Sequence, residues 1–214
     1  MFEQHGFDPV TIADIARTAD VAVQTVFNHF PTKEELFFDG RVDWVTWPAR
    51  AVRMRAPSTP PLTALRQGLV ELTAELVSSH TCPQRRGYIA TIEGSEALRV
   101  QERELVHEAE IQLAAALLEA WSADSDDTRR PADPVAIAPL VAAMWISAGR
   151  ALVTDQRPRL AAGADPRAVA AEVAALADGM LRQLEESVVR SPARPRAVAA
   201  PDTGWPAGAM RRAG

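Results

Sequence analysis

A run from Thr11 to Phe30 constrains the fold more than any other part of the chain, because it carries two short helical patterns in succession. The first pattern places four small or apolar residues on one helix face: Ile12, Ile15, Ala16 and Ala19. In the second pattern, Val26 and Phe30 lie about one turn apart and are expected to face inward. The small side chain of Ala16 suits a second helix that crosses the first at close range. This run therefore predicts a helix-turn-helix.

The ends of the first helix carry their own signals. Thr11 precedes the apolar pattern and Asp14 follows three residues later, which is a capping-box-like start. Asp20 lies in the turn, and Asp tolerates a left-handed backbone better than most residues. We expect Val21, next in the turn, to point inward.

The second helix leaves a polar face directed outward, which can read the edges of bases: Gln24, Thr25, Asn28 and His29. Pro31 ends this helix, and Thr32 can cap the next one. We expect that next helix to run from Lys33 to Arg55 and to join the N-terminal unit directly to the rest of the chain, with Trp44 and Trp47 as packing residues.

The run from Gly6 to Phe37 resembles the N-terminal signature of the tetracycline-repressor (TetR) family, over about 32 of the 214 residues. That signature is a Gly-Phe pair, a Thr-hydrophobic-x-x-Ile-Ala segment, a turn, and an aromatic segment followed by Phe-x-x-Lys-x-x-Leu. The matching residues are Gly6, Phe7, Thr11, Ile12, Ile15, Ala16, Val21, Thr25, Phe27, Phe30, Lys33, Glu35, Leu36 and Phe37. Three positions depart from the pattern: Asp20 stands where Gly is common, Val23 where Lys or another polar residue is common, and Phe27 where Tyr is usual.

The resemblance implies an all-α fold, with an N-terminal helix-turn-helix DNA-binding domain and a C-terminal helical domain for ligand binding and dimerisation. We expect these domains at residues 1–55 and 56–190, followed by a disordered tail at 191–214. The implied function is a cytoplasmic transcriptional regulator, most readily a repressor that a small molecule releases from a palindromic operator. Its partners would be double-stranded DNA, a small apolar effector and a second copy of the chain. The residues expected to contact DNA are Thr11, Val23, Gln24, Thr25, Phe27, Asn28, His29 and Lys33.

The front of the chain departs further from the family, which places a full helix before the Gly-Phe pair. Here only Met1 to His5 precede Gly6. In the family, that helix covers the apolar backs of Ile12, Ile15 and Phe30 and brings basic residues to the phosphates. Either the given sequence starts late, or the domain is incomplete.

Charge does not by itself indicate a nucleic-acid partner, because the formal net charge is -5. Residues 1–55 hold six basic and eight acidic side chains, and the five arginines from Arg190 onward lie in a segment rich in Pro, Ala and Gly. The prediction of DNA binding therefore depends on the helix-turn-helix pattern.

Beyond Pro57 the chain shows helical periodicity and no strand alternation. Leucines recur at helical spacing in one segment, at Leu62, Leu65, Leu69, Leu72 and Leu76. Two Asp-Pro pairs, beginning at Asp133 and Asp165, supply an N-cap and a first-turn proline for the last two helices.

Those last helices, from Val135 to Thr154 and from Val169 to Val188, carry apolar residues on more than one face. A helix with two apolar faces needs two partners, which suggests one within the subunit and one outside it. The resemblance implies a four-helix dimer interface here, and the residues expected in it are Trp145, Ala148, Gly149, Leu152, Val173, Leu176, Met180 and Leu184. The alternative is that both are core helices of a monomer.

The resemblance also implies an effector pocket among the middle helices. Candidate lining residues are Tyr88, Ile92, His107, Leu113, Trp121 and Trp145, although each of these types is more often plain core. Cys82 is the single cysteine, which excludes an intrachain disulfide and favours a reducing compartment.

Catalysis and membrane insertion are not expected. The four histidines are scattered, and we find no nucleophile with a base, no Gly-rich phosphate loop and no metal-spaced cluster, so we expect no enzyme, cofactor or metal. The most apolar stretch, Val135 to Gly149, is short and is ended by Arg150, which argues against a membrane span. The alternative function is a ligand-binding or protein-interaction helical dimer that does not bind DNA.

Overall fold

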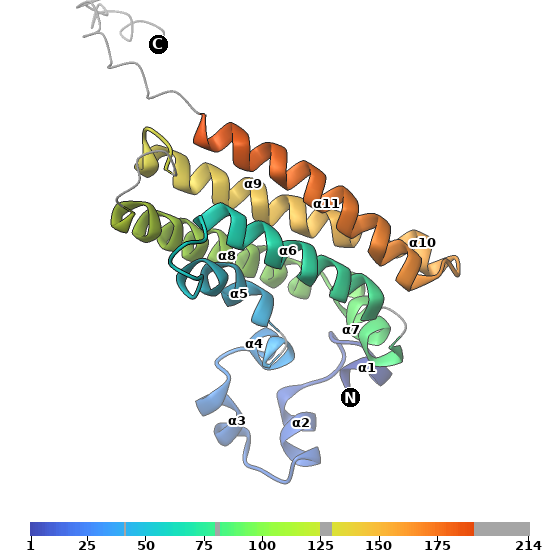
Figure 1. Ribbon diagram of the computed structural model, residues 1–214. Coiled ribbons are helices and arrows are strands. Elements are labelled where there is room, and N and C mark those ends of the chain that lie inside the picture. Colours follow the sequence, from blue (N-terminus) through green and yellow to red (C-terminus); the bar gives the residue numbers. More distant parts are fainter. Residues whose placement is uncertain (41, 80–81, 125–129, 191–214) are drawn as a thin grey trace, which may run out of the picture.

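The computed structural model describes residues 1–40, 42–79, 82–124 and 130–190, and every regular element among them is a helix (Figure 1). The expected all-α fold is therefore confirmed. The expected tail at 191–214 lies outside the described residues. In chain order the helices are α1 (Phe2–His5), α2 (Ile12–Thr18), α3 (Val23–His29), α4 (Lys33–Phe38), α5 (Asp43–Arg53), α6 (Pro61–Ser78), α7 (Pro83–Gly94), α8 (Glu96–Ala123), α9 (Pro134–Thr154), α10 (Arg157–Ala161) and α11 (Pro166–Val189).

The long helices form one helical body, in which α6 packs on α11, and α8 packs on both α5 and α9. The helices α2 and α3 project from it at one end, below α4 (Figure 1). The two predicted Asp-Pro starts are confirmed: Asp133 accepts a hydrogen bond from the Ala136 amide at 3.1 Å, and Asp165 caps α11 in the same way. Each aspartate is followed by proline at the first helical position.

The main core of the body includes α5. Val45, Ala49 and Val52 are buried in the same apolar cluster as Leu65 of α6 and Leu113 of α8. The segment up to residue 55, expected to belong with the helix-turn-helix, thus shares its last helix with the helical body.

The expected single helix from Lys33 to Arg55 was wrong, because the chain breaks it into α4 and α5. Gly40 adopts φ +64° at the break, a left-handed backbone that glycine accepts without steric cost. The N-terminal unit, residues 1–38, is therefore joined to the helical body through a bend. Since α4 and α5 are separate helices, a displacement of α5 need not move α4 by the same amount.

The contact between α5 and α6 depends on a glycine. The ring of Trp47 lies directly against Gly68, so that a Cβ placed on this residue would meet the ring at 2.0 Å. Gly68 therefore permits the close approach of these helices.

An ion-pair network joins α6 to α11. Arg66, whose side chain is 10% exposed, donates to Glu185 at 3.0 Å and also to Asp178. Burial opposes the charge of Arg66, but the hydrogen bonds to Glu185 and Asp178 outweigh it and raise the pKa of Arg66 above its ordinary value. Thr63 adds a hydroxyl donor to Glu185. The network fixes the register of the two helices.

One helical stretch among the described residues, Pro134–Ala161, is long and apolar enough to cross a membrane by length and composition. It continues through Arg150 and is longer than the apolar run that the sequence suggested. A single such helix is weak evidence for a span, because core helices of soluble proteins meet the same criterion.

Candidate functional site

The α2 helix begins as the sequence predicted. The Thr11 hydroxyl accepts from the Asp14 amide at 3.1 Å, and the Asp14 carboxylate accepts from the Thr11 amide at 3.1 Å, so both halves of the capping box are present. The hydrogen bond from the Thr11 hydroxyl, with further help from the Thr11 amide, lowers the pKa of the Asp14 carboxyl below its ordinary value. Above that pKa, Asp14 is ionised and accepts the hydrogen bonds that cap the start of α2.

The turn between α2 and α3 is confirmed as left-handed at Asp20, with φ 54°. Val21 follows, and the expectation that its side chain points inward was wrong, because 43% of it is exposed. Its amide donates to the Ala16 carbonyl at 3.0 Å, which closes the turn through the backbone. Ile12, Ile15 and Phe30 are only half-buried, so few side chains cover this side of the unit.

The α3 helix buries Val26 and leaves its other side chains exposed, among them the predicted readers Val23, Gln24, Thr25, Phe27, Asn28 and His29. Gln24 and Asn28 lie one turn apart, and the Gln24 amide donates to the Asn28 side-chain oxygen at 3.0 Å. This pair places two amide groups side by side in the middle of the exposed face. Such amides can contact the edge of an adenine through two hydrogen bonds.

Lys33 does not lie on that outer face. Its ammonium donates to the carbonyls of Phe7, Asp8 and Val10 at 3.0, 3.3 and 3.0 Å, and it lies 4.2 Å from the centre of the Phe7 ring. All three of its donors are used within the protein. Lys33 therefore holds the loop before α2. Contrary to the prediction that it contacts the DNA backbone, its ammonium is directed at these carbonyls and away from the outer face.

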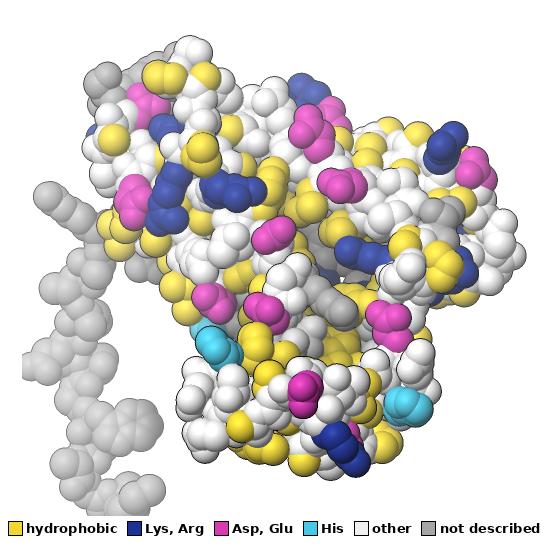
Figure 2. Space-filling model, turned by 90° about the horizontal axis from the view of Figure 1, so that it is seen from below, with side chains coloured by type: hydrophobic (Ala, Val, Ile, Leu, Met, Phe, Trp, Pro, Cys, Tyr) yellow, Lys and Arg dark blue, Asp and Glu magenta, His cyan; other side chains and the backbone are white. Residues whose placement is uncertain are grey.

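The N-terminal unit carries few basic side chains, as Figure 2 shows from the side of α2 and α3. Within residues 1–40, Arg17 and Lys33 are the Lys and Arg side chains. Arg17 pairs with Asp14 and is 74% exposed, so it can turn toward a phosphate at small cost. An interface here would depend on amides, hydroxyls and rings more than on charge.

A cluster of aromatic rings docks the N-terminal unit on the α7–α8 corner. Phe37 is 2% exposed and contacts four rings, with centroid distances of 5.6 Å to Phe2, 5.8 Å to Phe7, 5.1 Å to Phe38 and 5.0 Å to Tyr88. The rings of Phe37 and Tyr88 are parallel to within 6°. A partly buried hydrogen bond from the Ser95 hydroxyl to the Asp8 carboxylate, at 2.7 Å, ties the loop before α2 to the same corner.

Two hollows meet beside this cluster. The first is a chamber of about 130 Å³ lined by residues from α4 to α10, and the second is an open cleft of about 680 Å³ over α5 and α6. Both are lined by Trp44, Leu72, Leu76, Arg85 and Tyr88. The joined hollows reach the size of small-molecule sites in proteins.

The structure brings two of the six predicted pocket residues, Tyr88 and Ile92, to the chamber wall. Leu113, Trp121 and Trp145 are fully buried in the main core and line neither hollow. His107 points to solvent, with its side chain 72% exposed and its Nδ1 3.5 Å from Glu110.

Sequence reasoning missed several residues that line the chamber: Phe38, Trp44, Arg85, Glu102, Arg150 and Arg157. A signal was available for one of them, because Arg150 interrupts an otherwise apolar helix. The others become neighbours only through the bend at Gly40 and the α7–α8 corner.

The predicted interface residues divide between two faces of the last helices. Trp145, Gly149 and Val173 are buried within the subunit, where they have no surface to offer a partner, and Ala148, Leu152 and Leu184 are half-buried against the core. Leu176 and Met180 are 52% and 50% exposed on α11, and Leu140 and Met144 are exposed on α9, which packs on α11.

Residues 1–39 match the family described as bacterial regulatory proteins, tetR family. No curated protein matches this chain. Among solved structures, the chain is similar to NalD, described as the secondary repressor of the MexAB-OprM multidrug efflux pump in Pseudomonas aeruginosa. The identity is 22% and the TM-score 0.48, over 82% of this chain and 87% of that chain. The resemblance of the N-terminal residues to the TetR family is thus confirmed over residues 1–39.

Proposed function

We propose that this protein is a transcriptional repressor that reads DNA with α3 and is released by a small molecule bound beside the α7–α8 corner. One observation carries the proposal: a capped α2–turn–α3 unit, within the residues that match the family, leaves nearly the whole of α3 exposed. In this arrangement Gln24 and Asn28 contact base edges. Thr11, Val23, Thr25, Phe27 and His29 lie at or near the sugar-phosphate backbone.

The experiment that tests this proposal is footprinting of the full chain on the DNA that flanks its own gene. We expect protection of two half-sites related by two-fold symmetry, with centres about 34 to 36 Å apart or a multiple of that spacing. Protection that is uniform along the DNA, or absent at protein concentrations far above those used for specific binding, would contradict it.

A second function has one observation in its favour, the scarcity of basic side chains on the N-terminal unit. In that case the protein is a ligand-binding helical dimer that does not bind DNA. The same footprint separates the two functions, because only the repressor protects a defined sequence.

The outer faces of α9 and α11 are the surface we propose for dimerisation. These helices lie next to each other at one edge of the body (Figure 1). Leu140 and Met144 from α9 and Leu176 and Met180 from α11 are exposed large apolar side chains. A second copy related by a two-fold axis would cover them, and it would set the spacing of two α3 helices on DNA.

Replacing Met180 with Glu should convert the dimer to a monomer, because the interface would have to desolvate an unpaired carboxylate. Leu176→Glu should do the same. Ile111→Glu is the matched control, since Ile111 is 58% exposed on α8, which is not one of the two helices of this face. Light scattering that shows an unchanged dimer for both α11 variants would remove this face as the interface.

Release of DNA is proposed to pass through the aromatic cluster. Phe38, Tyr88 and Ile92 line the chamber, and the first two contact Phe37. A ligand that moves the Tyr88 ring therefore acts on α4, which leads directly to α3. Linkage then requires DNA to weaken ligand affinity by the same factor by which the ligand weakens DNA affinity.

A further inference from the structure

The chamber beside Tyr88 has a largely apolar wall. Phe38, Leu69, Ile89, Val106 and Ile146 contribute to it from five different helices. A wall of this kind favours an apolar ligand body and excludes water from part of the site. The charge that such a ligand can carry depends on the polar side chains of the same chamber.

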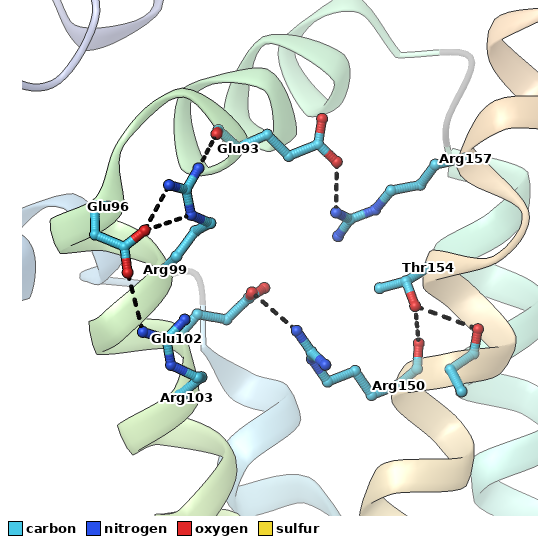
Figure 3. Close-up of polar contacts among 9 residues, drawn as sticks. Glu93, Glu96, Arg99, Glu102, Arg103, Arg150, Thr154 and Arg157 are labelled. Carbon is cyan, nitrogen blue, oxygen red and sulfur yellow. Dashed lines mark hydrogen bonds and ion pairs between the residues drawn. The ribbon is translucent and has the colours of Figure 1, made fainter.

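Three arginines line the chamber against one carboxylate, Glu102. Arg150 lies 3.6 Å from Glu102, and Arg157 donates to Glu93 at 2.7 Å. Figure 3 shows Arg150 and Arg157 reaching from α9 and α10 toward the α7–α8 corner, where these two glutamates lie. Both of these arginines therefore have acidic partners.

Arg85 differs from the other two arginines. Its Nε is buried and has no hydrogen-bond partner among the described residues. The carboxylates that line the open cleft with it are Glu3, Asp43, Glu71 and Glu75, and no ion pair between any of them and Arg85 is found among the described residues. The Nε of Arg157 is likewise buried without a partner in the described part of the chain. A buried guanidinium nitrogen without a partner is costly, and an anion placed on it removes that cost through charge-assisted hydrogen bonds.

Arg85 lies where the two hollows meet, since it lines both the chamber and the open cleft. Trp44 and Tyr88 line the same junction and offer flat rings to a ligand body. A molecule with an acidic group and an apolar body can thus rest its acidic group on Arg85 while its body lies against the rings and the apolar wall.

We propose that the effector is an amphipathic organic anion whose acidic group binds Arg85 and is further attracted by Arg150 and Arg157. This inference rests on the proposed function for the role of the site, but binding itself can be measured without DNA. An uncharged molecule of the same shape leaves Arg85 without a partner, so it binds more weakly.

The test uses two fluorescent probes with the same aromatic body and the full chain. 1-Anilinonaphthalene-8-sulfonate carries an acidic group, and N-phenyl-1-naphthylamine lacks it. We expect Arg85→Met to weaken sulfonate binding by roughly 10-fold or more, the effect of losing a charged hydrogen bond, and to change binding of the neutral probe by less than about 2-fold. Arg85→Lys, which keeps the charge, should restore part of the loss.

Arg103→Met is the matched control, because it changes the net charge equally and Arg103 pairs with Glu96 on the surface of α8, outside both hollows. It should leave both affinities as they are. Equal affinity of the intact protein for the two probes, or the same loss for both probes in Arg85→Met, would overturn the inference.

Measuring affinity for the footprinted DNA with and without the sulfonate probe distinguishes this inference from the proposed function. If the sulfonate binds through Arg85 but leaves affinity for the footprinted DNA unchanged, the anion site stands and the proposed release mechanism fails. If the sulfonate weakens DNA binding equally in the intact protein and in Arg85→Met, the anion site fails and ligand release stands.

Discussion

Replacing Phe37 with alanine should release the α2–α3 unit from the helical body and abolish specific DNA binding. Phe37 is 2% exposed and contacts the rings of Phe2, Phe7, Phe38 and Tyr88. Truncating a buried phenylalanine removes about 3 to 5 kcal/mol of stability. This cluster is the main apolar contact between the α2–α3 unit and the α7–α8 corner. The lost stability should therefore weaken the attachment of this unit to the helical body.

Hydrogen exchange locates that loss. In Phe37→Ala, amides of α2 and α3 should lose protection while those of α6, α8 and α9 keep it, since the main core does not include Phe37. Phe27→Ala is the control, because Phe27 is 44% exposed on α3 and should lower DNA affinity without changing exchange. Unchanged protection of α2 and α3 in Phe37→Ala would show that the ring cluster does not hold the unit in place.

Replacing Arg66 with methionine should destabilise the helical body by about 3 to 5 kcal/mol, the usual cost of removing one partner from a buried ion pair. The substitution keeps a long side chain but leaves Glu185, whose side chain is 18% exposed, without its cation. The hydrogen bonds from Arg66 to Glu185 and Asp178 join α6 to α11, so the loss should separate these helices.

Denaturant unfolding at fixed protein concentration measures the effect. Arg182→Met is the matched control, because Arg182 also pairs with Asp178 but is 55% exposed. A surface pair contributes little, so its unfolding midpoint should stay close to that of the intact protein. Equal midpoints for Arg66→Met and Arg182→Met would mean that burial does not make the Arg66 network important.

Local signals made the helix starts predictable. Thr11 with Asp14 and the two Asp-Pro pairs each satisfy backbone amides within three residues, so no distant contact is needed to form them. The turn at Asp20 was predictable for the same reason, because its left-handed backbone depends on one residue.

The break between α4 and α5 was not predicted, although Gly40 marks it, because helical periodicity continues on both sides of the glycine. Lys33 was misplaced for a different reason. Its three acceptors are carbonyls of Phe7, Asp8 and Val10, and a sequence does not show where the carbonyls of a loop point.

The candidate pocket shows the limit of residue type as a guide. Trp121 and Trp145 are buried in the main core, although large aromatic residues on helices also suit a ligand site. Arg85, Arg150 and Arg157 come from α7, α9 and α10, and only the folded chain brings them to one chamber. The outer face of α11 could not be separated from its inner face by periodicity, since Val173 and Leu176 are both apolar but only Leu176 is exposed.

The central claim is that α3 reads DNA sequence, and the most direct measurement compares two affinities of the intact protein with those of Asn28→Ala. The two DNAs are the footprinted site and a scrambled site of the same length and composition, at one salt concentration. Loss of the Asn28 amide should weaken binding to the footprinted site by about 1 to 3 kcal/mol per half-site and leave binding to the scrambled site unchanged, because a base contact carries specificity. A uniform loss on both DNAs, or no loss on either, would contradict the claim that Asn28 and the exposed face of α3 read the sequence.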